Sequence, residues 1–386
     1  MIFQIDGAST GNKGAQLMIF AIIDAVLKKF PDAHILINNQ DVDLSIFKKE
    51  NLVQVDKVPH SLGQKLVRMT HTHRIIKLLF PKKSVSLTKY KASPDVDMIL
   101  DAGGFQFGDT WKHNQYDLLK WNEYLNNSKK NGTVTVFLPQ AFGPFQKDIS
   151  KKMGKTIIDG ASIVYARDTI SYDYLKELTA NPKNICLSTD FTALVNGVQT
   201  SQSKECQGKV CMIPNSKMIS EGIVGEEQFV DAFSNIINFI FNKGYEVFLL
   251  NHEGENDLRL CNKIAERMAN RSVSVYSGLD ALETKGVIAS SYLVVSSRFH
   301  GVANSLNSCV PCLATSWSHK YQMLMEDYDQ FDNILDLNDM TVTYSKIESL
   351  LGKDTNAKTR RVLTEKKKEI CNTIEKMWDN IWGLLS

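Results

Sequence analysis

Residues 2–38 read IFQIDGASTGNKGAQLMIFAIIDAVLKKFPDAHILIN. An apolar strand-like run comes first, a glycine-rich turn follows, and an amphipathic helix-like run leads to a second apolar run at 34–38. The same alternation continues with strand-like runs at 98–100, 134–138, 164–166 and 185–187 and a helix-like run near 117–130. Alternating strand and helix signals predict a parallel sheet that is covered by helices.

The pattern stops at a polar segment and then restarts. Residues 196–208, NGVQTSQSKECQG, break the periodicity and are typical of a linker. The chain has 386 residues, which is more than one hydrophobic core usually serves. We therefore predict an α/β protein of two Rossmann-like lobes facing a cleft. The predicted divisions are an N-terminal lobe (1–195), a linker (196–208), a C-terminal lobe (209–355) and a C-terminal amphipathic helix (356–386).

Composition excludes several classes of protein. With 43% hydrophobic and 23% charged residues the chain is a soluble globular protein rather than a fibrous or disordered one. A net charge of +2 gives no reason to expect nucleic acid. No signal-like or membrane-spanning run is apparent, so we expect a cytoplasmic protein with seven reduced cysteines. Cys309 and Cys312 have the spacing of a redox or metal motif, but we favour two packed cysteines and predict no metal site.

Two segments carry local charge or amphipathic character. Residues 57–92 hold nine Lys or Arg and no Asp or Glu, which suits contact with an anionic membrane surface or, alternatively, a solvated basic face. The tail 361–385 repeats apolar residues at helical spacing between Lys and Glu. Such a helix lies on a membrane or, more commonly, packs on its own protein.

Polar and glycine-rich segments follow several strands, at the edge of the sheet where ligands collect in this class of fold. The turn 7–14 offers backbone N–H groups, among them that of Gly14, and the side chains of Asn12 and Lys13 to an anion or to sugar hydroxyls. It lacks the residues of a P-loop, and a tight turn without a ligand is the alternative. Gly103 and Gly104, in DAGGFQFGD, allow either a ligand or a helix to approach the backbone closely.

Arginine and histidine side chains follow two other strands. Arg167 and Asp168 come after the run 164–166, where an arginine fork suits a carboxylate or phosphate and a surface or capping role is the alternative. Arg298 and His300 come after the buried-looking run 293–296 in SSRFHG and are the strongest candidates for chemistry. His252 and Asp257, in NHEGEND, follow a further strand and line the cleft or are plain loop residues.

At these residues the chain resembles the polysaccharide pyruvyl transferase family. The resemblance rests on separated segments that occur in the family's order over roughly residues 5–330: GNKGAQ, DAGGFQFGD, LPQAFGP, ARD with the following Ser171, Thr189-Asp190, SSRFHG, Pro311 and WSHKYQML. Phe299 stands where other members often have another apolar residue.

The resemblance implies a GT-B-like fold, phosphoenolpyruvate as co-substrate with no other cofactor, and a sugar with two suitably placed hydroxyls as acceptor. It also implies that Arg167, Arg298 and His300 form the donor site. The N-terminal lobe resembles the acceptor side, and it is too variable in the family to carry over a sugar. Because surface polysaccharides are commonly modified on a polyprenyl diphosphate, the predicted partners include a lipid-linked acceptor, and the predicted location extends to the inner face of the plasma membrane.

Phosphoenolpyruvate chemistry fits these residues. Two arginines suit a donor that carries a carboxylate and a phosphate. An imidazole, with an ordinary pKa of about 6.5, is a suitable acid for the methylene carbon, and the alternative role is that of a base on the attacking hydroxyl. Asp168 is expected to orient Arg167, and Lys320 to add a third positive charge. Two other functions remain open: a GT-B-type glycosyltransferase that uses a nucleotide sugar, and a non-catalytic carbohydrate-binding protein.

Overall fold

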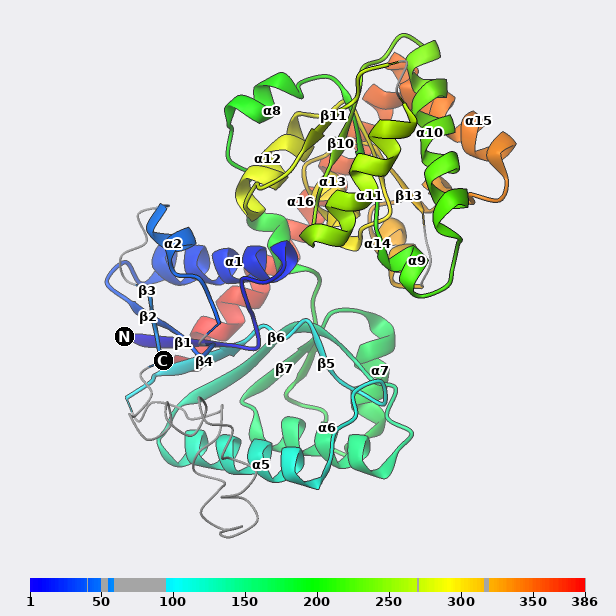
Figure 1. Ribbon diagram of the computed structural model, residues 1–386. Helices are drawn as coiled ribbons and strands as arrows, with labels where there is room; N and C mark the ends of the chain where they lie inside the picture. The colour runs from blue at the N-terminus through cyan, green and yellow to red at the C-terminus, as the bar shows by residue number, and fades with distance from the viewer. Residues whose placement is uncertain (40, 50–54, 59–94, 269–270, 316–318, 386) are drawn as a thin grey trace, which may run out of the picture. The chain divides into compact units, whose positions relative to one another are not determined.

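The computed structural model describes residues 1–39, 41–49, 55–58, 95–268, 271–315 and 319–385 (Figure 1). The predicted basic segment 57–92 lies outside these residues except for Lys57 and Val58. The described chain forms two compact units. The N-terminal unit comprises residues 1–11, 18–192 and 373–386, and the C-terminal unit comprises residues 12–17 and 193–372.

The N-terminal unit is built on a parallel sheet in which eight strands are described, with the order β3-β2-β1-β4-β6-β7-β8 and β5 paired to β6. The pairings between these strands are parallel. Its elements are β1 (Ile2–Asp6), α1 (Lys13–Lys29), β2 (His34–Ile37), α2 (Ser45–Lys49), β3 (Val55–Lys57), β4 (Met98–Asp101), β5 (Phe105–Phe107), α5 (Gln115–Lys130), β6 (Val134–Phe142), α6 (Asp148–Gly160), β7 (Ile163–Ala166), α7 (Thr169–Glu177), β8 (Ile185–Leu187) and the 3₁₀ turn η2 (Phe191–Leu194).

Local sequence explains why helices of this unit begin where they do. The Asn114 side chain accepts hydrogen bonds from the backbone at the start of α5, and the Asp117 side chain accepts one from the backbone N–H of Asn114. Such a capping box satisfies donors that the first helical turn leaves free. The inner sides of α5 and α6 then bury Trp121, Tyr124 and Ile157 in one cluster with residues of β4, β6 and β7.

The C-terminal unit repeats this design. Its six described strands run in the order β11-β10-β9-β12-β13-β14, and all are parallel. The elements are α8 (Ser201–Glu205), β9 (Val210–Ile213), α9 (Lys217–Ser220), α10 (Glu226–Asn242), β10 (Val247–Leu250), α11 (Gly254–Arg267), β11 (Ser274–Tyr276), α12 (Ala281–Ser290), β12 (Leu293–Ser296), α13 (Phe299–Asn307), β13 (Cys312–Thr315), α14 (His319–Asp327), η3 (Phe331–Asn333), β14 (Ile334–Leu335), α15 (Met340–Leu351) and α16 (Lys353–Trp382). The last turns of α16 and the following 3₁₀ turn η4 (Gly383–Leu385) belong to the N-terminal unit.

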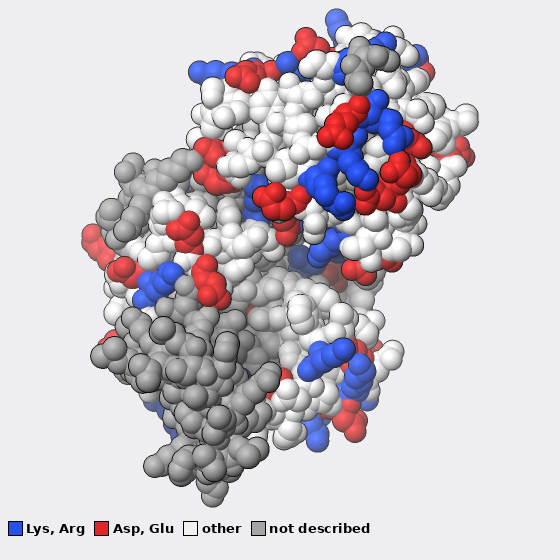
Figure 2. All heavy atoms as spheres, in the orientation of Figure 1, with Lys and Arg blue, Asp and Glu red and all other residues white. Residues whose placement is uncertain are grey.

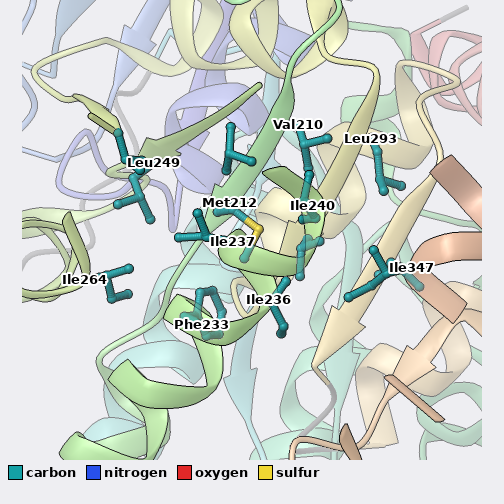
Figure 3. Packing of buried hydrophobic residues seen from close by; sticks show 14 of the residues in the cluster. Val210, Met212, Phe233, Ile236, Ile237, Ile240, Leu249, Ile264, Leu293 and Ile347 are labelled. Carbon is teal, nitrogen blue, oxygen red and sulfur yellow. The ribbon is translucent and has the colours of Figure 1, made fainter. Parts of the chain in front are cut away.

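The core of the C-terminal unit forms between β9 and α10. Val210 and Met212 are two residues apart on β9, so both side chains are on the same face of the strand. They pack in one cluster with Phe233, Ile236 and Ile240 (Figure 3). All five are fully buried. At roughly 1.5–3 kcal/mol for each buried large apolar side chain, this layer is a main source of the unit's stability.

The predicted α/β fold with two Rossmann-like units is confirmed. In both sheets the order follows the doubly wound pattern, in which the chain reverses its direction of growth after the third strand. The predicted linker, 196–208, contains the short helix α8 and belongs to the C-terminal unit. The first residues of α1 also belong to the C-terminal unit, and the end of α16 belongs to the N-terminal unit.

The apolar face of α16 is buried within the protein. Leu363, Ile374 and Ile381 are completely inaccessible to solvent, and Met377 and Trp378 nearly so. The apolar residues of α16 therefore pack on the protein itself rather than on a membrane. Across the described residues, no helix combines the length and the apolar character needed to cross a bilayer.

Charged side chains on the visible face of the C-terminal unit are paired rather than segregated. Figure 2 shows blue and red groups side by side there, and Arg259, Lys263 and Arg267 of α11 pair with Glu226, Glu227 and Asp231 of α10. Exposed pairs of this kind contribute little to stability, typically about 0–1 kcal/mol each. All seven cysteines are free thiols, and Cys312 is buried in β13.

Candidate functional site

The switch point of the C-terminal sheet lies between β9 and β12, where strand order reverses and where ligands bind in doubly wound folds. Asn215 and Ser216 follow β9, and Ser297 and Arg298 follow β12. The two loops are joined by a hydrogen bond of 2.9 Å from the Asn215 amide to the Ser297 carbonyl oxygen. The two strand ends therefore present one continuous edge.

The turn between β12 and α13 places Arg298 and His300 at this edge. The Ser296 hydroxyl accepts a bond from the Arg298 backbone N–H (3.1 Å) and donates one to the Arg298 carbonyl oxygen (3.0 Å). A Cβ atom at Gly301 would lie 2.4 Å from the Ser296 oxygen, so only glycine lets α13 begin so close to the strand. His300 consequently lies in the first turn of α13.

Arg298 is held by two carboxylates. Its Nε atom donates to Asp257 Oδ2 at 2.6 Å, and its Nη1 atom donates to Glu253 Oε2 at 2.7 Å. Burial alone would lower the pKa of the guanidinium, but the bond and charge of Asp257 and the charge of Glu253 raise it above the ordinary value. Arg298 is therefore a permanent cation whose charge is already balanced by the protein.

Asp257 ties Arg298 to the β9 loop. Its carboxylate is fully buried, and Oδ1 accepts bonds from the Ser216 backbone N–H (2.9 Å) and hydroxyl (2.7 Å). Together with the bond from Arg298, both oxygens are satisfied, as a buried charge requires. The sequence prediction that Asp257 lines the site is consistent with this position, but its contacts are with the protein.

The His300 ring lies against the turn 12–14, in the space that a side chain at Gly14 would fill. A Cβ atom at Gly14 would lie 2.2 Å from the His300 ring, so the imidazole packs directly on the glycine backbone. The neighbouring Lys13 donates from Nζ to the carbonyl oxygens of His252 (2.6 Å) and Asn251 (3.4 Å). Burial lowers the pKa of Lys13, while the charges of Glu253 and Asp257 counteract that effect. Lys13, Gly14, His252 and His300 thus lie together.

His252 is a buried group with unused hydrogen-bonding capacity. Its side chain is 1% exposed, and neither ring nitrogen has a hydrogen-bond partner. The ring lies nearly parallel to that of His300, with centroids 6.5 Å apart and an interplanar angle of 14°. Burial, followed by the charge of Lys13, lowers the pKa of His252 well below its usual value, so the imidazole is neutral. Two unsatisfied nitrogens at a switch point indicate a place for a ligand or an ordered water.

Two other predicted site residues have different surroundings. Asn12 accepts a bond from the Ala15 backbone N–H (2.8 Å) and so caps α1, which is a structural task. Lys320, on α14, is exposed, with its ammonium 5.1 Å from the centre of the Phe299 ring. Glu253, which the sequence analysis did not select, contacts Arg298; its only sequence signal was its place in NHEGEND after a strand.

The switch point of the N-terminal sheet lies between β1 and β4 and is occupied by two carboxyl groups. Asp6 and Asp101 are partners in the strand register, and both are buried. Asp101 Oδ1 accepts bonds from Gln106 (2.6 Å), Gln140 (3.0 Å) and the Gly103 backbone (3.1 Å), whereas Oδ2 has no partner. Burial and the charge of Asp6 raise the pKa of Asp101 to about 7.

Glycines pack tightly around this carboxyl pair. Gly7 has φ of +75°, and a Cβ atom there would lie 2.6 Å from the backbone nitrogen of Gly103. A Cβ atom at Gly103 would lie 2.2 Å from the Gln106 amide. Gly104 has φ of +68°, a conformation that favours glycine. Close packing within the unit therefore accounts for Gly7 and Gly103, and backbone conformation accounts for Gly104.

Arg167 and Asp168 follow β7 in the N-terminal unit. Arg167 is partly exposed, and its backbone N–H donates to the Gln140 carbonyl oxygen at 3.0 Å. Asp168 accepts a bond from the Ser171 backbone N–H at 2.7 Å and is the N-cap of α7. The Asp168 side chain therefore caps α7, and its predicted role in orienting Arg167 stays a prediction.

Comparison with known proteins identifies the family. The sequence profile described as polysaccharide pyruvyl transferase matches residues 12–319, which is most of the chain. The chain belongs to this family. It is accordingly a transferase of the pyruvyltransferase class, acting in polysaccharide biosynthesis.

One curated relative of the transferase is the amylovoran biosynthesis protein AmsJ of Erwinia amylovora, which is 20% identical over 403 aligned positions and covers 94% of this chain and 92% of that protein. The fold also resembles solved structures. The UDP-GlcNAc 2-epimerase of Neisseria meningitidis, bound to UDP-GlcNAc, gives a TM-score of 0.63 at 9% identity with 99% of each chain covered. HepE of Anabaena, in complex with UDP-glucose, gives 0.56 at 12% identity with 99% of each covered.

These similarities establish the GT-B-like fold of the transferase, whereas its ligands depend on its own residues. In the described part of the chain, no group of three or more His, Cys, Asp or Glu residues could hold a metal ion. Of the predicted site residues, Asn12, Lys13, Gly14, His252, Arg298, His300 and Lys320 belong to the C-terminal unit, and Gly103, Gly104, Arg167 and Asp168 to the N-terminal unit.

Proposed function

We propose that this transferase moves pyruvate from phosphoenolpyruvate to two hydroxyls of a sugar, as a cyclic ketal, during the synthesis of a surface polysaccharide. The observation that carries the proposal is the cluster at the C-terminal switch point. Lys13 and Arg298 supply cationic groups there, and His252 and His300 supply two imidazoles within 6.5 Å of each other, one of them buried with both ring nitrogens unpartnered.

Charge complementarity supports an anionic donor at this cluster. Phosphoenolpyruvate presents a carboxylate and a phosphate on a three-carbon frame, and an arginine fork and an ammonium suit these two groups. The neutral ring of His252 adds one N–H donor that is already desolvated, so its bond to a phosphate oxygen replaces no bond to water. The N-terminus of α13 lies beside His300 and favours negative charge.

The proposed reaction begins with a proton. His300 gives its ring proton to the methylene carbon of the donor, which becomes a methyl group and leaves an oxocarbenium-like C2. The first sugar hydroxyl attacks C2 and gives its proton back to His300. The C–O bond to phosphate then breaks and C2 again becomes oxocarbenium-like. The second hydroxyl attacks C2 to close the ring, and its proton leaves with the phosphate. The products are the ketal and inorganic phosphate. In the alternative, His300 takes the proton of the attacking hydroxyl.

Arg167 is proposed to assist the donor on the basis of the family resemblance. It belongs to the N-terminal unit, which we propose to bind the acceptor sugar. Replacement of Arg167 by Ala is expected to lower turnover about 10²-fold, by analogy with the loss of a single transition-state hydrogen-bond donor. If Arg167→Ala retained full activity, its assignment to the donor would be wrong.

The test of the proposed function is phosphate release from phosphoenolpyruvate against a panel of acceptors. Galactose, mannose, glucosamine and mannosamine are supplied free and as lipid-linked saccharides. We expect release that depends on one acceptor and that falls about 10²-fold or more in His300→Ala, because a general acid is lost. Release of nucleotide from a nucleotide sugar, with no phosphate from phosphoenolpyruvate, would instead indicate a glycosyltransferase. Sugar binding without either turnover would indicate a non-catalytic carbohydrate-binding protein.

We propose further that the acceptor is carried by a polyprenyl diphosphate at the inner face of the plasma membrane. The support is the sequence of residues 57–92, where each Lys or Arg near an anionic bilayer contributes about 1 kcal/mol. Co-sedimentation with anionic vesicles should fall when Lys77, Lys82, Lys83 and Lys89 are changed to Glu. Unchanged co-sedimentation would remove the membrane proposal without affecting the chemistry.

A further inference from the structure

We propose that Glu253 is an exchangeable ligand of Arg298, which holds the guanidinium before the donor binds and is replaced by the carboxylate of the donor, while Asp257 is the permanent positioning partner. The inference rests on the proposed function, because it assigns one half of the donor to one arginine. It follows from a difference between the two carboxylates that hold Arg298.

Asp257 has the environment of a fixed partner. Its side chain is completely buried, and it accepts bonds from the Ser216 backbone, the Ser216 hydroxyl and Arg298. If the bond between Asp257 and Arg298 broke, the buried carboxylate of Asp257 would keep its charge with one oxygen unpaired, which is costly. Asp257 therefore stays on Nε and fixes the direction of the guanidinium plane.

Glu253 has the environment of a replaceable partner. Its side chain is 28% exposed, and within the described part of the chain its one hydrogen bond is to Arg298 Nη1. A carboxylate that leaves this position enters water rather than an apolar interior, so its departure costs little beyond the bond itself. Arg298 Nη1 is thus the point where a second carboxylate can bind.

The backbone around Glu253 gives the displaced carboxylate a second place to bind. Glu253 is the N-cap residue of the 14-residue helix α11, yet its side chain makes no capping bond. The following Gly254 has φ of +65°, so the chain turns sharply at this point. As the N-cap residue, Glu253 could turn a released carboxylate toward the N–H groups of the first turn of α11, whose partial positive charge would stabilise it.

The exchange changes the net charge that the donor meets. Before the donor binds, two cationic groups, Lys13 and Arg298, face two anionic groups, Glu253 and Asp257, so these four groups carry no net charge. A dianionic donor would gain little from a cluster that is already neutral. Once Glu253 leaves, one positive charge is unbalanced and the donor carboxylate takes the vacated side of Arg298. Ligands that carry a carboxylate beside the phosphate are then preferred over phosphate alone.

Isothermal titration of the full-length protein with phosphoenolpyruvate and, separately, with inorganic phosphate tests this inference. In Glu253→Gln the competing charge is absent while the side chain keeps its size. We expect the dissociation constant for phosphoenolpyruvate to fall about tenfold, which corresponds to about 1.4 kcal/mol. Inorganic phosphate, which does not need to displace Glu253, should change by less than about threefold.

Glu255→Gln is the matched control, because it removes the same charge from an exposed position two residues further along. It should leave both constants within about twofold. Equal or weaker binding of phosphoenolpyruvate by Glu253→Gln, or an equal gain for the two ligands, would overturn the exchange. Failure of phosphoenolpyruvate to bind the wild-type protein would overturn the proposed function as well, so the two failures are distinguishable. A thermal unfolding curve that matches the wild type establishes that Glu253→Gln is folded.

Discussion

The two units of this transferase place different groups on the same framework. Both sheets grow in the doubly wound order, and both put polar side chains at the switch point. In the C-terminal unit these are Lys13, Arg298 and paired carboxylates with two imidazoles nearby. In the N-terminal unit they are Asp6 and Asp101, which are buried beneath glycine backbones.

The difference teaches that strand order fixes where a ligand binds, and that the few residues after each strand fix which ligand. Cations with balancing carboxylates suit a small anion whose arrival redistributes charge. The carboxyl pair of the N-terminal sheet is buried, and Asp101 accepts hydrogen bonds from side-chain amides of its own unit, so these groups serve the packing of the fold. The comparison therefore favours the C-terminal switch point for the anionic donor, and a sugar in the N-terminal unit stays a proposal.

The largest expected effect comes from breaking the ion cluster of the C-terminal unit. Arg298→Ala leaves the buried carboxylate of Asp257 without its cationic partner. We expect a loss of about 3–5 kcal/mol in the free energy of unfolding, measured by urea denaturation. Arg259→Ala, on the same helix as Asp257 and paired with Glu226 at the surface, is the control and should cost less than about 1 kcal/mol. Equal losses in both variants would contradict the assignment of a buried ion pair.

The contact between Gly14 and His300 provides a sharper test within the same unit. Gly14→Ala adds a carbon that must displace the imidazole, because the ring lies only 2.2 Å from the added position. We expect turnover to fall about 10²-fold, since a misplacement of about 1 Å has this effect on catalysis. Gly11→Ala is the control, because its added carbon would meet Ser9 at an ordinary 3.7 Å. Similar activities of the two variants would show that turnover does not depend on the exact position of the His300 ring.

The carboxyl pair of the N-terminal unit predicts a dependence of stability on pH. Asp101 has a folded pKa of about 7, which lies above the unfolded value of 3.8. At Asp101 the folded state therefore binds more protons than the unfolded state between these values, and the contribution of Asp101 to the free energy of unfolding falls as pH rises from about 4 to 7, by up to about 1.4 kcal/mol per pH unit. In Asp101→Asn this contribution is absent, so the difference between wild type and variant should change over that range.

Urea denaturation at pH 5, 6, 7 and 8 measures this difference, and Asp109→Asn is its control. Asp109 follows β5 and is only partly buried. Burial opposes its ionisation, but bonds from Ser150 and from the backbone of Gln146 and Lys147 outweigh that effect and lower its pKa. It is thus ionised throughout this range, and its difference from the wild type should be constant. A constant difference for Asp101→Asn too would mean that Asp101 keeps its charge.

The smallest expected effect separates capping from binding. Asp168→Ala removes the cap of α7 and should lower the free energy of unfolding by about 1 kcal/mol. Because its contact is with the helix backbone, the KM values for both substrates should stay within about twofold. A rise in either KM with unchanged stability would instead support the predicted substrate-binding role of Asp168.

Much of the fold and part of the site were predictable from sequence. The alternation of strand and helix signals indicated two parallel sheets, and the position of Arg298 and His300 after a buried strand placed them at an edge where ligands bind. Glu253 was missed because its partner lies on another strand end. The pairing of Asp6 with Asp101 depends on strand register, which periodicity does not reveal. Sequence does not distinguish a capping side chain from a ligand-binding one, and Asp168 shows this ambiguity.

The most direct test of the central claim is to observe the ring nitrogens of His252 and His300 while phosphoenolpyruvate is added. In ¹⁵N-histidine-labelled protein, His252→Gln and His300→Gln identify the two sets of signals. We predict that phosphoenolpyruvate shifts both sets in the wild-type protein, because the buried ring gains a hydrogen-bond partner and its neighbour gains a facing anion. Signals that stay in place with saturating phosphoenolpyruvate, or that move only with a nucleotide sugar, would contradict it.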